Sequence, residues 1–245
     1  MRNIAASAIL TVSLCLPALA GQAKSVEAES SLFATPLKEI EEAAEQLQEF
    51  AAGLIVERRN LDASIAEFAP ILEKICRVED ARRLETLSVE DYKIVVRYVK
   101  AAATVMDVFS DQPEHLITPN TNRLSSCFDV VVIAHTVTLN MAKEMAQNQS
   151  VKDNPEGVAE TVARLNRMAT YSVAVFDGVL DGFLLKEIAP EWCVEKPVLL
   201  LPFAKILSEF LTPKQKRYLA ENVQRTAKVC PTGRLGLHPV FQQFR

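Results

Sequence analysis

Residues 35–54 read TPLKEIEEAAEQLQEFAAGL, and this stretch decides the class of fold. Thr35 is a favoured N-cap residue, and Pro36 suits the first helical position because its missing N–H costs nothing there. The apolar residues that follow recur at alternating steps of three and four: Leu37, Ile40, Ala44, Leu47, Ala51 and Leu54. That spacing places them on one stripe of an α-helix, which is typical of a helix packed in a bundle.

Three further helix starts carry similar local signals. Ser88 followed by Asp91 resembles a capping box, and the helix it opens is expected to run to about Phe109. Asn154-Pro155 opens a long apolar pattern that reaches Ile188. Thr212-Pro213, with glutamine at 215, is a second capping box and predicts a helix to about Val229. The other expected helices lie at 61–75, with a kink or restart at Pro70, at 126–147 and at 198–210, and the tail from residue 230 is expected to be irregular.

Composition excludes most sheet-rich folds. The 245 residues include seven glycines, less than half of the average usage of about 7%. A sandwich, barrel or propeller of this size needs many turn positions with positive φ, which glycine usually occupies. The sequence therefore predicts an all-α, single-domain bundle of about six to seven helices, with two disulfides.

The first twenty residues have the pattern of a cleavable signal peptide. Arg2 supplies a positive charge, an apolar stretch extends from Ile4, and Ala18-Leu19-Ala20 is the small-x-small pattern that signal peptidase requires. We expect cleavage before Gly21, a small, flexible leader over 21–34 and the helical domain over 35–245. The mature protein is expected in the periplasm or outside the cell, and it is not expected to be an integral membrane protein.

Four cysteines remain after such cleavage: Cys76, Cys127, Cys193 and Cys230. An even number in an oxidising compartment favours disulfides, and three connectivities are possible. Pairing Cys76 with Cys127 and Cys193 with Cys230 is preferred, because each bond then joins neighbouring helical segments. The wide spacings do not fit a redox CxxC motif, a haem-attachment motif or a zinc knuckle.

The charge of the chain is acidic and unevenly distributed. The formal charge is −4, and loss of Arg2 with the signal makes it −5, which argues against a nucleic-acid partner. Residues 27–91 carry 16 acidic and 7 basic side chains, whereas residues 213–245 carry 7 basic side chains and one acidic side chain. Either these regions are complementary or simply solvated, or the C-terminal region docks an acidic partner or a membrane surface.

The sequence lacks the usual catalytic and cofactor motifs. It contains no GxSxG, SxxK, P-loop or GxGxxG pattern, and none of its three histidines stands in an ExxH or HxxxH pair. No catalytic residue, metal site or cofactor is therefore assigned. His135, among valines, is interpreted as a hydrogen-bonded core histidine rather than a metal or haem ligand.

Asp177 and Asp181 form the one unusual constellation. They stand four residues apart in an apolar helical pattern, where like charges repel by roughly 0.2–0.5 kcal/mol. Such a pair must find partners or have shifted pKa values. Ala174, Gly178 and Gly182, also spaced by four, would form a groove that another backbone can approach. Asp177 and Asp181 are the candidate ligand-binding residues; the alternative is that they are exposed or cap an interrupted helix.

The resulting functional hypothesis is an exported, non-catalytic helical protein that binds a protein partner or an apolar ligand. One alternative is a hydrolase-like enzyme that uses the aspartate pair as acid and base. Another is a lipid or haem carrier with an apolar cavity among its helices.

Overall fold

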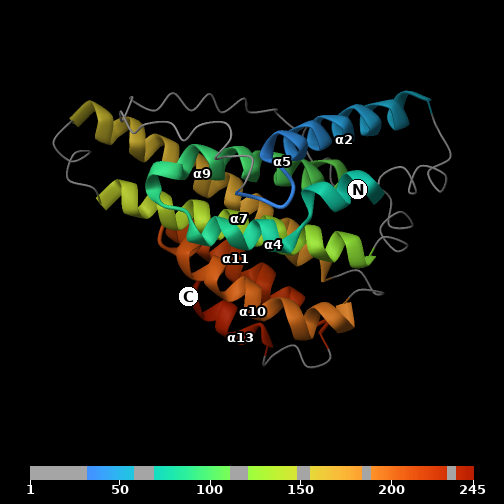
Figure 1. Ribbon diagram of the computed structural model, residues 1–245. Coiled ribbons are helices and arrows are strands. Elements are labelled where there is room, and N and C mark those ends of the chain that lie inside the picture. The colour runs from blue at the N-terminus through green and yellow to red at the C-terminus, as the bar shows by residue number, and fades with distance from the viewer. Residues whose placement is uncertain (1–31, 58–68, 111–120, 148–154, 184–188, 231–235) are drawn as a thin grey trace.

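The computed structural model describes residues 32–57, 69–110, 121–147, 155–183, 189–230 and 236–245 (Figure 1). All regular elements in these ranges are helical, which confirms the all-α prediction. They are α2 (Leu37–Glu57), α4 (Val78–Arg83), α5 (Tyr92–Ser110), α7 (Thr121–Gln147), α9 (Pro155–Gly182), α10 (Ala189–Ser208), α11 (Pro213–Thr226) and α13 (His238–Gln242), with 3-10 turns at Leu84–Thr86 and Val89–Asp91. Six of these helices are long, as expected; the short helices α4 and α13 were not predicted.

Helix α7 is the centre of the bundle. It packs against α5, α4, α10 and α9, while α2 lies on α5 and α11 lies on α9 and α13 (Figure 1). By length and composition, residues 125–147 of α7 could cross a membrane, and this is the one such segment in the described part of the chain. Two thirds of that apolar window is buried inside the bundle, with valines at 130–132 in the core. Its apolar character is therefore explained by its central position.

Two predicted capping boxes are present. The backbone N–H of Ser88 donates to the Asp91 carboxylate at 3.2 Å, just before α5. At α11, the N–H of Gln215 donates to Oγ1 of Thr212 at 3.3 Å, and the N–H of Thr212 donates to Oε1 of Gln215 at 3.0 Å. Each box satisfies backbone donors that the first helical turn leaves free.

The start of α2 differs by one residue from the expected cap. The carbonyl of Pro36 accepts from the N–H groups of Glu39 and Ile40, so Pro36 rather than Thr35 stands at the N-cap. The N–H of Thr35 donates instead to the buried carboxylate of Asp80, from α4, at 3.2 Å. Asp80 therefore fixes the chain just before α2 to α4.

Residues 32–34 belong to the packed domain rather than to the flexible leader that was expected to extend to residue 34. The ring of Phe33 is buried and lies 5.3 Å from the ring of Tyr98. The N–H of Ala34 donates to Asp80 at 2.7 Å. The remainder of the leader and the signal peptide lie outside the described residues.

Three helix boundaries were predicted incorrectly. Helix α9 ends at Gly182, short of Ile188, with a tight last turn in which the N–H of Phe183 donates to Leu180. Helix α10 begins at Ala189, so Pro197 lies inside the helix rather than before it. Helix α7 begins five residues earlier than Ser126. Of the helix expected at 61–75, only 69–75 is described, and that part is helical.

The C-terminal tail is not wholly irregular. Helix α13 has a proline in its first turn, where it costs no hydrogen bond, and it buries Val240. Phe244 follows it into the core and meets the ring of Phe176 edge-on at 5.2 Å. The tail therefore closes one side of the bundle.

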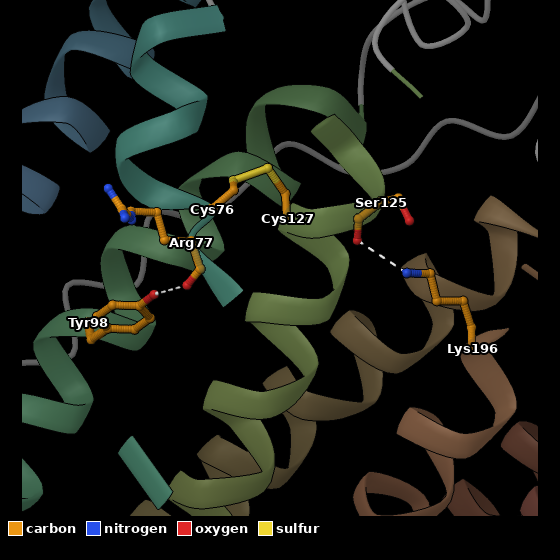
Figure 2. The surroundings of a disulfide bond; sticks show 6 residues. All are labelled: Cys76, Arg77, Tyr98, Ser125, Cys127 and Lys196. Atoms are coloured by element: carbon orange, nitrogen blue, oxygen red, sulfur yellow. Dashed lines mark hydrogen bonds between the residues drawn. A yellow bond between two sulfur atoms is a disulfide. The ribbon is translucent and has the colours of Figure 1, made fainter. Parts of the chain in front are cut away.

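Both preferred disulfides are present. The Cys76–Cys127 bond joins the chain after the helical segment at 69–75 to α7 (Figure 2). The Cys193–Cys230 bond joins α10 to the chain after α11. Each bond connects segments that are neighbours in the bundle. Two such bonds indicate an oxidising compartment.

Candidate functional site

Asp177 connects helix α9 to helix α11. Its Oδ2 accepts a hydrogen bond from the phenol of Tyr218 at 2.5 Å, and its Oδ1 accepts one from Nδ2 of Asn222 at 2.5 Å. Tyr218 and Asn222 stand four residues apart on α11, so both side chains reach the same carboxylate from one helix face. The bond to Asp177 stabilises the protonated phenol and raises the pKa of Tyr218.

Asp181, one turn further along α9, is held more loosely. Its carboxylate lies 3.6 Å from the guanidinium of Arg225, and both side chains are at least half exposed. Partial burial, and then the charge of Asp177, raise the pKa of Asp181, and Arg225 opposes this shift. The two aspartates therefore differ in role: Asp177 is fixed by two hydrogen bonds, and Asp181 is an exposed ion-pair partner.

The aspartates and their three α11 partners form an interhelical polar contact. Neither oxygen of Asp177 is free of a protein donor, which favours a structural role over acid–base chemistry at this residue. No group of three or more His, Cys, Asp or Glu side chains within the described ranges could hold a metal ion. Whether Asp177 and Asp181 bind a ligand stays a prediction.

Gly182 does not complete the backbone groove expected with Ala174 and Gly178. It faces an indole ring instead: a β-carbon at Gly182 would stand 2.4 Å from Cζ3 of Trp192. The glycine therefore admits a side chain from α10, while Ala174 is exposed to solvent.

An ion pair that the sequence patterns do not predict links the buried Lys196 of α10 to the partly buried Asp129 of α7. Nζ of Lys196 lies 2.5 Å from Oδ1 of Asp129 and 3.4 Å from the carbonyl of Ser125, and it stands 5.5 Å from the centre of the Trp192 ring. Figure 2 shows Lys196 reaching Ser125 beside the Cys76–Cys127 disulfide. Burial raises the pKa of Asp129, and the bond to Lys196 opposes the rise.

Helical spacing indicates that Lys196 is buried, but the proline that follows it suggested a later start of the helix. Lys196 stands four residues after Trp192 and three after Cys193, and thus on the same buried helix face. The following Pro197 suggested the start of a helix, which placed Lys196 outside it. The partner at position 129 is 67 residues away and cannot be read from spacing.

His135 lies in the core, as expected. Its side chain is 2% exposed, and Nδ1 lies 3.3 Å from Oγ of Ser172 on α9. The imidazole also packs beside the rings of Tyr171 and Phe203, at 5.5 and 6.0 Å. Burial lowers the pKa of His135 to about 4, so the ring is neutral at physiological pH.

Exposed apolar side chains gather near the second disulfide. The described residues contain five exposed large hydrophobic side chains, and the three valines among them are Val194 (66%), Val198 (77%) and Val229 (49%). Val194 and Val229 directly adjoin the cystine residues 193 and 230, whose Cα atoms are 5.6 Å apart. The two valines therefore have Cα atoms within about 13 Å of each other. We call Val194, Val198 and Val229 the valine patch.

Three exposed basic side chains lie along α11 or just after it, and the last of them directly precedes Val229 of the valine patch. Lys214 and Arg217 on α11, and Lys228 just after it, are exposed. Within the described chain none of the three has an acidic side chain in ion-pair distance, whereas the nearby Arg225 reaches Asp181. We call Lys214, Arg217 and Lys228 the α11 basic face. Comparison with protein-family models, with curated proteins and with solved structures finds no match.

Proposed function

We propose that this protein is exported to the periplasm or the cell exterior and there acts as a non-catalytic binding protein for another protein. The observation that carries the proposal is the valine patch. Single exposed hydrophobic residues are common on protein surfaces, but neighbouring ones that form a patch are typical of interaction sites. Val194 and Val198 are one helical turn apart, and they are the two most exposed of the large hydrophobic side chains described.

The backbone beneath the valine patch is constrained, and a constrained surface favours binding of a partner. The Cys193–Cys230 disulfide fixes α10 to the end of α11. The C-terminal segment lies close to this part of α10 at Gly236. A β-carbon at Gly236 would stand 3.2 Å from the carbonyl oxygen of Cys193 and 3.3 Å from Pro197. A surface held in one conformation loses little entropy when it binds, and this improves affinity.

A protein partner fits this surface better than a small apolar ligand does. Pockets for small molecules bury most of the ligand surface, whereas Val194 and Val198 project from the exposed side of α10. The aspartate pair offers less support for a hydrolase-like activity, since both oxygens of Asp177 are engaged by α11.

Export is tested by expressing the full chain in a bacterium and measuring the intact mass of the fractionated product. We expect a mature protein that begins at Gly21 and has a mass lower than that of the reduced form by four hydrogen atoms, from two disulfides. Retention of residues 1–20, or accumulation in the cytoplasm, would contradict export.

Binding is tested with a photo-reactive amino acid placed at Val198, and at the exposed Glu45 on α2 as a matched control. In the native host, we expect one defined protein to be cross-linked from position 198 and not from position 45. The variant Val198→Ser, in otherwise native protein, removes the apolar side chain and should reduce recovery of that same protein. Cross-linking from neither position, or equally from both, would contradict the proposal.

A further inference from the structure

We infer that the partner presents acidic side chains next to its apolar contact, and that the α11 basic face receives them. This inference rests on the proposed function, because it assumes a protein bound at the valine patch. It adds the chemistry of the partner and a second part of the interface.

The α11 basic face leads to the valine patch. Lys214 and Arg217 are one turn apart at the start of α11, and Lys228 follows its last turn, directly before Val229 and Cys230. At 1.5 Å per residue the basic face spans about 20 Å, which is the length of a three- to four-turn helix or a short extended segment. A partner seated on the valines therefore has Lys228 at its edge.

Apart from Glu221, the exposed acidic side chains of the described chain lie outside α11. Exposed glutamates are concentrated on α2, at Glu39, Glu42, Glu45 and Glu49. Helix α2 packs on α5, on the side of α7 opposite α11, α10 and α13 (Figure 1). The only ion pair in the described part of α11 joins Arg225 to Asp181. The charge of the α11 basic face thus remains available to another molecule, and complementary charge speeds association and selects the partner.

Two exposed glutamates near the valine patch and the α11 basic face favour a protein partner with acidic groups at separate positions over an anionic membrane. Exposed Glu221 lies within the same outer side of α11, and exposed Glu195 adjoins Val194. A uniformly anionic lipid surface would repel both glutamates. A protein can place its acidic groups opposite the three cations and leave the glutamates facing neutral or basic groups. The valine patch also lacks tryptophan, phenylalanine and leucine, the residues by which interfacial helices insert into lipid.

The test uses the full mature protein and a synthetic amphipathic helical peptide with leucines on one face and glutamates on the other. Binding is measured by fluorescence anisotropy at low and at physiological salt, because exposed charge contacts weaken as salt increases. A peptide with lysine in place of glutamate, and vesicles that mix anionic phosphatidylglycerol with phosphatidylcholine, are the alternative probes. Sedimentation of the protein alone tests whether a second copy, through its acidic α2, occupies the face instead.

Three variants separate the contributions of charge and of apolar contact to binding. Lys214→Glu/Arg217→Glu/Lys228→Glu reverses the α11 basic face. The control Lys93→Glu/Lys100→Glu/Arg167→Glu makes the same change in net charge at exposed positions on α5 and α9. Val194→Ser/Val198→Ser removes the apolar contact without altering charge.

We expect the glutamate peptide to bind with an affinity that falls as salt increases. Reversal of the α11 basic face should weaken binding by about tenfold or more, and the control reversal by much less. The valine variant should weaken binding and leave its salt dependence unchanged. If the valine variant weakens binding but charge reversal does not, the proposed function stands and this inference fails; if neither variant matters, both fail. Equal or stronger binding of the lysine peptide or the vesicles, or salt-sensitive self-association that requires the α11 basic face, would overturn the inference.

Discussion

Gly182 lies directly against the six-membered ring of Trp192, and the contact joins the end of α9 to the beginning of α10. A β-carbon at Gly182 would stand 2.4 Å from Cζ3 and 3.0 Å from Cη2 of the indole. The same indole meets the rings of Phe128 and Phe183 edge-on, at 4.5 and 5.7 Å, so it cannot move aside without disturbing the core. The glycine is thus required by packing at the point where the chain leaves one helix for the next.

Gly182→Ala should lower the free energy of unfolding by about 1–3 kcal/mol, as overpacking does in a well-packed core. Alanine is the better helix former by about 0.8–1 kcal/mol, so a stabilising effect would be expected if the site were open. Urea denaturation followed by circular dichroism measures the change. In a Trp192→Phe background the same substitution should cost clearly less, because Cζ3 and Cη2 of the indole are removed; an equal cost in both backgrounds would contradict the contact.

The two aspartates of α9 should respond differently to the same substitution. Asp177→Asn removes the negative charge from the group to which Tyr218 and Asn222 both donate, so two charge-assisted hydrogen bonds are weakened. We expect a loss of about 1–2 kcal/mol in the free energy of unfolding. Asp181→Asn removes the exposed ion pair with Arg225, which contributes little to the free energy of unfolding. It also removes the repulsion between Asp181 and Asp177, so the free energy of unfolding should change by less than about 0.5 kcal/mol.

Thermal and urea denaturation of the two single variants measure this difference. Tyr218→Phe is the matched control: it removes the donor to Asp177 and leaves the charge in place, and its effect should be non-additive with that of Asp177→Asn. Equal effects of the two aspartate variants would contradict the separate roles. A stabilising effect of divalent cations that requires both carboxylates would instead support a cation site.

Features encoded by a few adjacent residues could be predicted from the sequence. The capping boxes at Ser88 and Thr212 depend on residues three positions apart, and both are present. The cysteine pairing was also predictable, because segments close in sequence tend to be neighbours in a helical bundle. The apolar stripe of α2 is buried at Leu37, Ile40 and Leu47 for the same local reason.

Features that depend on distant residues were missed or only partly found. Asp177 was recognised as unusual, but its partners on α11 stand 41 and 45 residues away. A proline such as Pro197 normally stands at the start of a helix or ends it, but Pro197 lies inside α10. Proline lacks an N–H, so the helix loses one backbone hydrogen bond there. Packing of the buried Trp192 and Lys196 against α7 outweighs that loss.

Each disulfide should contribute about 2–4 kcal/mol to stability. The bonds close segments of 51 and 37 residues, lengths for which the loss of unfolded-state entropy is similar. Cys76→Ser/Cys127→Ser and Cys193→Ser/Cys230→Ser should therefore destabilise the mature protein to a comparable extent in urea denaturation. Thiol titration of the denatured, unreduced mature protein should find no free thiol. Two or four reactive thiols would contradict the assignment.

His135 should make the stability of the protein depend on pH. The ordinary pKa of the side chain is 6.5, and burial lowers the pKa of His135 to about 4 in the folded state. Between these values the unfolded chain binds a proton on this residue and the folded chain does not. The free energy of unfolding therefore falls as the pH is lowered from 6.5 toward 4, by roughly 3 kcal/mol over the whole window.

The variant His135→Asn tests this prediction, because asparagine keeps a polar group near the position of Nδ1, opposite Ser172, and cannot titrate. At pH 7 the variant should be less stable, since loss of the ring leaves a gap between Tyr171 and Phe203. Its disadvantage should shrink as the pH is lowered to 4.5, because only the wild type must then leave a histidine uncharged. Asp129 and Asp181, whose pKa values are raised, act in the opposite direction in both proteins, so the difference between wild type and variant isolates His135. Urea denaturation at several pH values measures that difference, and a constant difference would show that the imidazole gains a proton in the folded core as readily as in the unfolded chain.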